Sequence, residues 1–139
     1  MYRLIYKSRS IGKVDWDFVN EILGSSQEYN SEQDVSGVLL ATNTHFLQVL
    51  VGSFEDVNEV FSRIALDKRH EKMQLISFTC VEKRLFKNWA MNGIGVFDFN
   101  MELARQLKIT YGEEDGEVRF PTEEWQVLSL ISDIRMVNG

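Results

Sequence analysis

The sequence predicts an α+β fold in which two helices cover one face of a mixed, five-stranded β-sheet. Five segments are rich in aliphatic, β-branched and aromatic residues, and successive side chains along them would face opposite sides of a sheet. Two further segments place apolar residues three or four positions apart, which is typical of helices with one buried side. The segments follow one another in the order β-α-β-β-α-β-β, which favours a single sheet with helical connections.

The N-terminal part of the chain supplies the first strand and the first helix. We expect the strand over residues 2–8, with Leu4 and Tyr6 facing one side of the sheet. The helix is expected to begin near Asp15 and to run to about Asn30, because its apolar residues recur four positions apart.

Four more strands are expected further along the chain. Residues 35–41 and 45–51 have strand character, and the short polar link 42–44 between them predicts a hairpin. After the second helix, residues 73–81 and 89–93 have the same character. With the first strand, this order is close to the ferredoxin-like β-α-β-β-α-β pattern with one strand added.

The second helix has a clear start in the sequence. Ser53 with Asp56 three residues later is a capping-box pattern. The buried side of the helix would consist of Val57, Val60, Phe61 and Ile64. The polar run Asp67–His70 is expected to end the helix in solvent.

The second face of the sheet also needs a cover, because it would be apolar. Its residues would include Ile5, Leu47, Val49 and Val51. Residues 101–108 predict a short helix, and Pro121 begins a segment with a wide apolar side that predicts another. An acidic, glycine-containing link, 111–117, separates them. We therefore expect a sheet domain over residues 1–97 and an extension over 98–139 whose helices cover the second face.

The composition restricts the possible functions. A chain of 139 residues that is 44% hydrophobic and 26% charged fits one folded domain. The formal net charge of −6 gives no general support for nucleic-acid binding. The longest apolar runs are about five residues, too short to cross a membrane, and charges near the N-terminus argue against a signal peptide. We expect a cytoplasmic protein that binds neither nucleic acid nor membrane.

The residue types that bind metals are sparse. The chain has one cysteine, Cys80, and two histidines, His45 and His70, which are far apart in the sequence. This spacing predicts no metal site. Cys80 lies in an apolar run, so we expect a buried, unreactive thiol.

Two polar side chains fall on the helix-covered face of the predicted sheet. Gln48 alternates with Phe46 and Leu50, so it faces the same side as they do. Tyr6 lies on the equivalent face of the first strand. A buried amide has two donors and two acceptor sites to satisfy, so Gln48 needs partners.

The first helix would bring more polar groups to the same layer. Ser26 and Asn30 follow Ile22 along one side of that helix. Each polar residue alone has an ordinary structural explanation, such as a helix end for Asn30. Together, with Ile22 and Ile64 as aliphatic walls, they indicate a slot for a flat heterocycle.

Five segments of the chain carry a resemblance to a known family. They are Leu4–Ser8, Asn30 with Val35–Leu40, Phe46–Gly52, Asp67–His70 and Arg84–Met91. Asn30 follows Tyr6 by 24 residues, Gln48 follows Asn30 by 18, and Trp89 follows Gln48 by 41. In this order and spacing they resemble the BLUF family of blue-light sensors, in its short single-domain type. The resemblance covers residues 2 to about 97.

The resemblance implies a cofactor and the residues that hold it. In that family FAD, or FMN or riboflavin in its place, binds non-covalently between the two helices. Ile22 and Ile64 would sandwich the ring, and Asn30 and Arg63 would hydrogen-bond to its edges. The cofactor residues that the resemblance implies are Ile22, Asn30, Phe46, Gln48, Arg63, Ile64, Asp67, Arg69 and His70.

The resemblance also implies a photochemical sequence. Tyr6 would give an electron and a proton to the excited flavin, and Gln48 would relay the proton and change its orientation or tautomer. Trp89 and Met91 would shift near Gln48 and pass the change to the sheet. Ser26 would hold either Gln48 or Trp89.

Two positions depart from the family pattern. Many members have a second asparagine where this chain has Tyr29, and a glutamate where it has Val51. Neither position touches the Tyr6–Gln48 pair, but both would affect flavin affinity or dark recovery.

The sequence is less specific about the output of such a sensor and about alternative functions. No effector motif follows Phe97, so we expect a non-enzymatic sensor that signals through a downstream protein partner or a homo-oligomer, with residues 98–139 as transmitter. One rival is an acylphosphatase-type enzyme, for which Arg9–Gly12 is the candidate anion-binding loop. The other is a ferredoxin-like module that binds a flavin or another small ligand without a photocycle.

Overall fold

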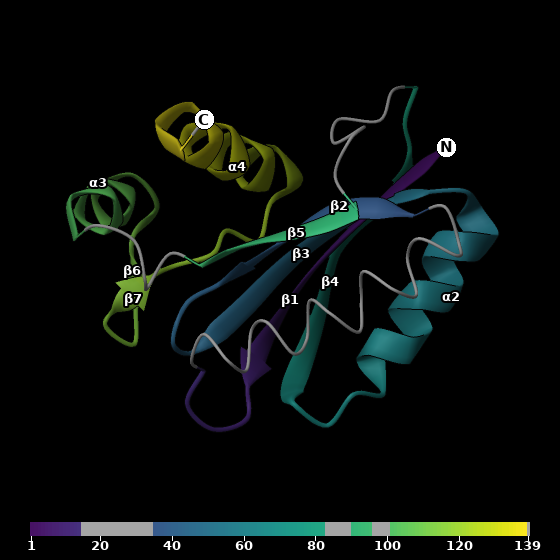
Figure 1. The fold of residues 1–139 in the computed structure, drawn as a ribbon, viewed down its shortest axis with the longest axis horizontal. Helices are drawn as coiled ribbons and strands as arrows, with labels where there is room; N and C mark the ends of the chain where they lie inside the picture. The colour runs from purple at the N-terminus through teal and green to yellow at the C-terminus, as the bar shows by residue number, and fades with distance from the viewer. Residues whose placement is uncertain (15–34, 83–89, 96–100, 139) are drawn as a thin grey trace.

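The computed structural model describes residues 1–14, 35–82, 90–95 and 101–138. Most of the described strands form one sheet, with helices on both sides of it (Figure 1). The strands of this sheet are β1 (Tyr2–Ser10), β2 (Ser36–Ala41), β3 (His45–Gly52), β4 (His70–Cys80) and β5 (Ala90–Gly95). The other described elements are α2 (Phe54–Ala65), α3 (Met101–Tyr111), the hairpin β6 (Glu113–Glu114) and β7 (Glu117–Val118), and α4 (Glu124–Asn138).

The sheet has the predicted ferredoxin-like topology with an added strand. Its strand order is β4-β1-β3-β2-β5. β1 pairs antiparallel with both β3 and β4, β2 pairs antiparallel with β3, and β5 joins β2 in parallel. The prediction of a mixed, five-stranded sheet is therefore confirmed. The first helix, expected to run from Asp15 to about Asn30, lies outside the described residues.

β1 and β4 extend beyond the residues predicted for them, and β5 also ends later than predicted, at Gly95 rather than at residue 93. β1 continues to Ser10, and β4 begins at His70 rather than near residue 73. Ser10 pairs with His70 and Arg9 with Glu71, so each extension supplies the other with hydrogen-bonding partners. The sequence pattern missed them because these residues are polar, and pairing between strands does not depend on hydrophobic alternation alone.

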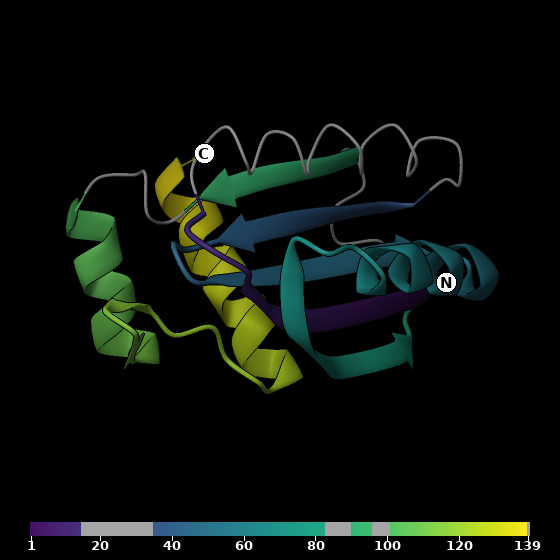
Figure 2. The same ribbon diagram turned by 90° about the horizontal axis from the view of Figure 1, so that it is seen from below.

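Both faces of the sheet are buried, and each has its own cover. α2 lies on one face and α4 on the other, with α3 beside α4 (Figures 1 and 2). The core on the α2 side contains Leu4, Tyr6, Val14, Val35, Leu39, Ala41, Phe46, Leu50, Val57 and Val60. The core on the α4 side includes the predicted Ile5, Leu47, Val49 and Val51, together with residues of α3 and α4. The predicted role of the C-terminal helices as a cover is confirmed.

α2 begins where the capping pattern places it. Ser53 is the N-cap, and its hydroxyl oxygen accepts a hydrogen bond of 3.2 Å from the backbone N–H of Asp56. That bond satisfies one of the N–H groups that have no partner within the helix. The buried side carries Val57 and Val60, with Phe61 and Ile64 packed against the same core.

The acidic, glycine-containing link expected over residues 111–117 contains most of a short hairpin, formed by β6 and β7. Asp115 and Gly116 form its turn with positive φ angles of 53° and 81°. Asp-Gly is a preferred pair for such two-residue turns, because both positions require a left-handed backbone. The signal was present in the sequence, but the strands on either side have only two residues each.

A glycine in β2 allows the backbone of β3 to approach closely. A Cβ atom added at Gly37 would lie 1.9 Å from the carbonyl oxygen of Val49. Any larger residue would push β2 away from β3. Since Leu39 and Gln48 are register partners in this strand pair, Gly37 helps to set the position of Gln48.

The expectation of a buried cysteine was wrong. Cys80 is a free, exposed cysteine at the C-terminal end of β4. β4 is an edge strand, so it has a neighbouring strand on one side only. Leu75 on the same strand is 54% exposed for this reason. An apolar run therefore does not guarantee burial at the edge of a sheet.

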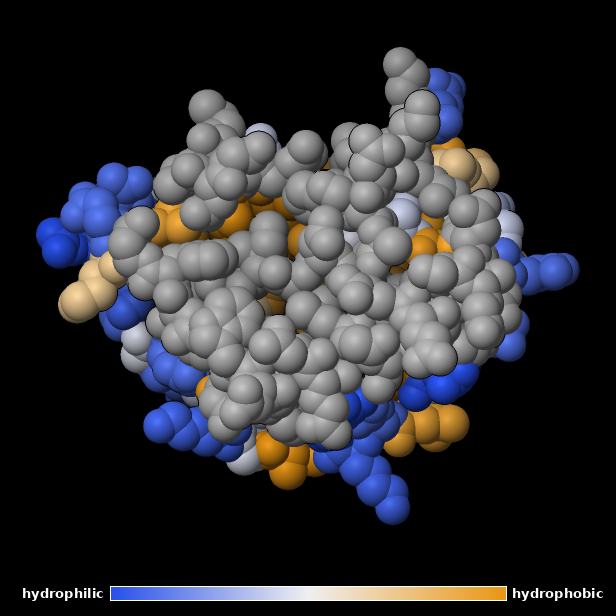
Figure 3. Space-filling model, in the orientation of Figure 1, coloured by the Kyte–Doolittle hydropathy of each residue, from blue (hydrophilic) through white to orange (hydrophobic). Residues whose placement is uncertain are grey.

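The surface of the described residues is largely hydrophilic where it can be seen. In the orientation of Figure 1, hydrophilic residues lie around the rim of the molecule, with a few apolar patches among them (Figure 3). None of the described helices combines the length and the apolar character that crossing a bilayer requires.

Polar contacts fasten the β6–β7 hairpin to the sheet. Lys7 is 5% exposed, and its ammonium group donates to Glu114 (3.0 Å) and to the backbone carbonyl of Phe120 (2.9 Å). On either side of it, Arg9 binds Asp115 and Asn43 donates to Glu117. We call this set of contacts, which includes His45 at 3.7 Å from Glu114, the cap clasp.

The charge of Glu114 matters to the cap clasp. Burial raises the pKa of its carboxyl group, but the hydrogen bond from Lys7 and the charges of Lys7 and His45 outweigh this, and the pKa lies below its ordinary value of 4.5. A carboxylate with a depressed pKa stabilises the fold at pH values above 4.5, and this contribution is lost as the pH falls through the folded-state pKa.

We predict that Glu114→Gln lowers the free energy of unfolding by about 1–2 kcal/mol at pH 7, because it leaves the buried Lys7 without its anion. The difference from the parent chain should shrink between pH 7 and pH 3, as the Glu114 carboxylate takes up a proton on the way through its folded-state pKa. Urea unfolding followed by circular dichroism at both pH values measures this. Glu113→Gln is the matched control, since that exposed neighbour lies 3.5 Å from Lys108 and does not contact Lys7. Equal losses for the two variants at pH 7 would contradict the prediction.

Candidate functional site

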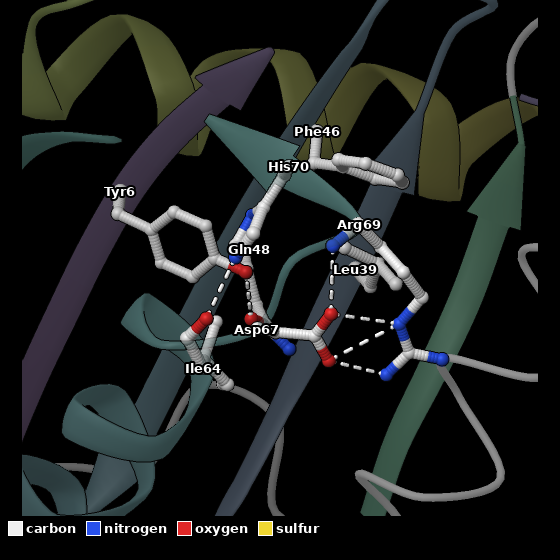
Figure 4. A pocket seen from close by; sticks show the side chains of 8 residues that line it. All are labelled: Tyr6, Leu39, Phe46, Gln48, Ile64, Asp67, Arg69 and His70. Atoms are coloured by element: carbon white, nitrogen blue, oxygen red, sulfur yellow. Dashed lines mark hydrogen bonds and ion pairs between the residues drawn. The ribbon is translucent and has the colours of Figure 1, made fainter. Parts of the chain in front are cut away.

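A cavity opens on the α2 side of the sheet, between the strands and the C-terminal end of the helix (Figure 4). The described residues that line it are Tyr6, Leu39, Phe46, Gln48, Ile64, Asp67, Arg69 and His70. Its empty volume is about 330 Å³ with the open mouth included.

A phenol and an amide meet at the centre of this cavity. Tyr6 on β1 and Gln48 on β3 are register partners in the central strand pair. The Tyr6 hydroxyl donates a hydrogen bond to Oε1 of Gln48, and the two residues are 3% and 1% exposed. With its oxygen turned to Tyr6, the amide presents its N–H groups in other directions. Sequence and structure agree that this pair is buried on the helix-covered face.

The environment of Tyr6 keeps its phenol neutral. Burial raises the pKa of the Tyr6 hydroxyl far above its ordinary value, and the negative charge of Asp67 raises it further. Tyr6 is therefore a hydrogen-bond donor at any physiological pH. If the ring loses an electron, the hydroxyl becomes strongly acidic, and the hydrogen bond to Gln48 gives its proton an immediate acceptor.

An ion pair forms the polar rim of the cavity. The backbone N–H of Arg69 donates to Oδ1 of Asp67 at 2.9 Å, and Nε of the same arginine donates to Oδ1 and Oδ2 at 2.9 and 3.1 Å. The hydrogen bond from the Arg69 side chain holds the pKa of Asp67 below its ordinary value. This segment was expected to end the helix in solvent. Asp67 and Arg69 are instead half-buried, because they pair with each other at the cavity mouth.

His70 closes one wall of the cavity. Its Nε2 lies 2.7 Å from the carbonyl oxygen of Ile64, and its Nδ1 lies 2.8 Å from the Ser8 hydroxyl. The ring meets those of Tyr6 and Phe46 edge-on, with 6.1 Å between centroids in each case. His70 thus contacts a strand, the end of α2 and the central phenol at once.

The cavity brings together most of the described residues that the sequence assigned to the site. Tyr6, Phe46, Gln48, Ile64, Asp67, Arg69 and His70 all line it. Arg63 is exposed in the last turn of α2 and is not among the described lining residues. The side chains of Ile22, Ser26, Tyr29, Asn30, Trp89 and Met91 lie outside what the structure describes. The backbone of Met91 is described and forms part of β5.

Sequence reasoning missed two residues of this region. Leu39 lines the cavity because it is the register partner of Gln48 on β2. Ser8 is two residues from Tyr6 and so shares its face of β1, where it contacts His70. Both follow from strand pairing and alternation, which would have found them once the register was known.

The anion-binding loop considered for an enzyme is not formed. Arg9 belongs to β1 and pairs with Asp115 of the β6–β7 turn at 2.9 Å. The Ser10 hydroxyl donates to the carbonyl oxygen of Gly12 at 3.0 Å. The side chains that would hold an anion are thus engaged elsewhere, so the acylphosphatase-type hypothesis has no support in this segment.

Comparison with known proteins identifies the family. Residues 1–92 match the family described as BLUF, sensors of blue-light using FAD. The chain belongs to the BLUF family. Its members bind a flavin and respond to blue light. Among the described residues, the cavity with the buried Tyr6–Gln48 pair is a place where such a ligand would fit.

Curated relatives share the sensor segment with this chain. The beta subunit of a photoactivated adenylate cyclase from Euglena gracilis is 31% identical over 91 residues, which are 64% of this chain and 11% of that protein. The blue light- and temperature-regulated antirepressor BluF of Escherichia coli K12 is 26% identical over 98 residues, 70% of this chain and 24% of its own length. The chain thus matches a small part of these longer relatives.

Solved structures share the fold. The dark-state structure of BlrB, a BLUF protein, aligns with this chain at a TM-score of 0.77 and 22% sequence identity. The alignment covers 98% of this chain and 96% of the BlrB chain. A bacterial light-regulated adenylyl cyclase has a TM-score of 0.69 at 26% identity, over 99% of this chain and 35% of its own. The likeness to BlrB includes the C-terminal helices, since it spans nearly the whole of both chains.

The described residues fit one edge of a flavin. A flavin ring carries carbonyl and ring-nitrogen groups along one edge, and Gln48 and Arg69 supply amide and guanidinium groups at the cavity. Ile64 and Leu39 supply aliphatic surface for the ring face. This combination of apolar walls with a few polar groups is typical of sites for flat cofactors.

We predict that Asp67→Asn weakens flavin binding by about tenfold, because Arg69 loses the charged partner that fixes its side chain at the mouth. Titration of flavin-free protein with FAD, followed by quenching of flavin fluorescence, measures the affinity. Glu55→Gln is the matched control, since Glu55 is exposed in the first turn of α2. An unchanged affinity in Asp67→Asn would show that the Asp67–Arg69 pair does not shape the site.

Proposed function

We propose that the response to blue light in this chain runs through the Tyr6–Gln48 pair, with FAD as the bound flavin. The observation that carries the proposal is the hydrogen bond from the Tyr6 hydroxyl to Oε1 of Gln48 inside the cavity. FAD is preferred because the family description names it. FMN and riboflavin share its ring and remain alternatives, since the described cavity residues recognise the ring edge only.

A bound flavin would supply the absorption of blue light and an acceptor for one electron. Tyr6 gives up that electron, and its hydroxyl proton moves along the existing hydrogen bond toward Gln48. Electron and proton return to Tyr6 together, so the phenol is regenerated and no bond to the protein is made or lost. The lasting change is in Gln48, whose amide ends in a different orientation or tautomer.

Gln48 suits this role because an amide has two hydrogen-bonding states. Rotation of the group by half a turn exchanges a C=O acceptor for an N–H donor at nearly the same place. In the described orientation the oxygen accepts from Tyr6. A changed amide would offer the flavin edge a new hydrogen bond, which lowers the energy of its absorption band. Light therefore biases a group that is bistable by its chemistry.

We infer that the signal leaves through the C-terminal extension over residues 98–139, toward a downstream protein or a second copy of the chain. Two observations support this. The α4 side of β1 and β3 carries the cap clasp, and Lys7 adjoins Tyr6 in sequence. The extension covers an apolar face that a partner could use only if the cap shifts. We further infer a non-enzymatic sensor of the cytoplasm, where the exposed Cys80 stays reduced.

We predict that Tyr6→Phe binds flavin but shows no light-induced red shift, because the variant keeps the ring and loses the donor hydroxyl. Absorption spectra recorded before and after blue illumination measure the shift. The band to follow lies at roughly 450 nm, where oxidised flavins absorb. Tyr111→Phe is the matched control: its hydroxyl bonds Ser129 and Asp133, away from the cavity. A photocycle retained in Tyr6→Phe would overturn the donor assignment. Flavin binding without any shift in the parent chain would favour a binding module without a photocycle.

We predict that illumination speeds hydrogen exchange of backbone amides in α3 and α4, because movement of β1 and β3 would loosen the cap clasp. Hydrogen–deuterium exchange with peptide-resolved mass spectrometry on dark and lit protein measures this. The Tyr6→Phe variant under the same light controls for heating and photodamage. Identical exchange of residues 101–138 in both states of the parent chain would contradict an output through this extension.

A further inference from the structure

The imidazole of His70 is held at both nitrogens by groups from two different elements. Nε2 faces the carbonyl oxygen of Ile64 in the last turn of α2, and Nδ1 faces the hydroxyl of Ser8 on β1. The ring therefore connects the end of the helix to the sheet. It does so on the wall of the cavity, beside the ring of Tyr6.

The two partners determine where the imidazole proton sits. A carbonyl oxygen can only accept, so Nε2 must carry a hydrogen. In the neutral ring Nδ1 is then an acceptor, and the Ser8 hydroxyl is the group that donates to it. Ser8 is 1% exposed, so bulk water cannot readily replace it. The contact selects one tautomer and one orientation of the ring, because a flipped ring would present carbon atoms to both partners.

The Ser8–His70 contact lies next to the photochemical pair. Tyr6 and Ser8 share one face of β1, and their register partners Gln48 and Phe46 share the same face of β3. His70 touches the rings of Tyr6 and Phe46. A shift of the His70 ring would therefore change the packing around Tyr6 directly.

We propose that Ser8 is a positioning residue, which holds His70 in its Nε2–H form as a fixed wall of the flavin cavity beside Tyr6. The proposal rests on the photochemical role of the Tyr6–Gln48 pair. In this arrangement the wall stays in place while Gln48 changes, and the geometry of Tyr6 is the same before and after each cycle. Ser8 itself takes part in neither the electron transfer nor the proton transfer. It acts through His70.

Removal of the hydroxyl tests the proposal with a small change in volume. In Ser8→Ala, Nδ1 of His70 loses its donor, and the ring can turn or change tautomer. We expect the lit state to return to the dark state about fivefold faster, because a looser wall lowers the barrier for Gln48 to turn back. Ser8→Thr keeps the hydroxyl and should restore the parent rate. The matched control is Ser10→Ala, on the same strand, whose hydroxyl serves the carbonyl of Gly12.

A second measurement reads the tautomer itself and needs no flavin. The chain has two histidines, so ¹⁵N-labelled histidine gives two imidazole rings to observe by NMR. His70→Gln removes one set of signals and assigns the other to His45. We expect His70 to show a protonated Nε2 and an unprotonated, hydrogen-bonded Nδ1 in the parent chain and in Ser10→Ala. In Ser8→Ala the Nδ1 resonance should shift toward the position of a free imidazole.

The outcomes separate this proposal from the proposed function. A protonated Nδ1 with a bare Nε2 in the parent chain would overturn the role of Ser8, and so would a Ser8→Ala variant with unchanged His70 resonances. Unchanged dark recovery in Ser8→Ala, alongside a shifted Nδ1, would show that the wall does not govern the photocycle and would also overturn it. A parent chain without a photocycle would refute the proposed function, while the NMR result would still decide the Ser8–His70 link.

Discussion

The antiparallel pairing of β1 with β3 is the constraint on which the rest of the structure depends. It places Tyr6 opposite Gln48, Lys7 opposite Leu47 and Ser8 opposite Phe46. Because side chains alternate between faces, a slip of one residue would move Tyr6 to the α4 side and bring the charge of Lys7 into the cavity. Both faces are buried, so a change of register would place side chains in the wrong core on both of them. The set of side chains that these two strands contribute to the cavity is thus a consequence of their pairing.

The same pairing would give the proposed signal a short path. On one face, Tyr6 and Gln48 meet in the cavity; on the other, Lys7 holds the hairpin of the C-terminal extension through Glu114 and Phe120. When a side chain on one face of the sheet moves, the backbone of its strand shifts. The adjacent residue, whose side chain lies on the other face, shifts with it. No chain of residues across the molecule is needed, because sheet and cap share two strands. Packed interfaces respond in this way by shifting between discrete arrangements rather than by bending gradually.

Much of this could be predicted from the sequence because strands and helices follow from local patterns. The two apolar faces and the covering role of the C-terminal helices followed from periodicity, and the Ser53 cap followed from a local capping motif. Partners distant in sequence were harder: Ser8 with His70 and Lys7 with Glu114 are separated by 62 and 107 residues, and no local pattern specifies them. The exposure of Cys80 was also missed, since an edge strand looks like an inner one until strand order is known.

A switch needs one group that can change inside surroundings that do not. The described cavity has this division. Asp67 and Arg69 fix each other through several hydrogen bonds, and His70 is held at both nitrogens. Gln48 differs from them, because the end of its amide that bonds Tyr6 can be exchanged without moving the backbone. If the side chains that line the cavity could move as well, the energy of the absorbed light would be distributed over many small rearrangements. In the proposed photocycle, rigid neighbours would confine the change to one amide, and the close packing of β1 and β3 would carry that change to the opposite face of the sheet.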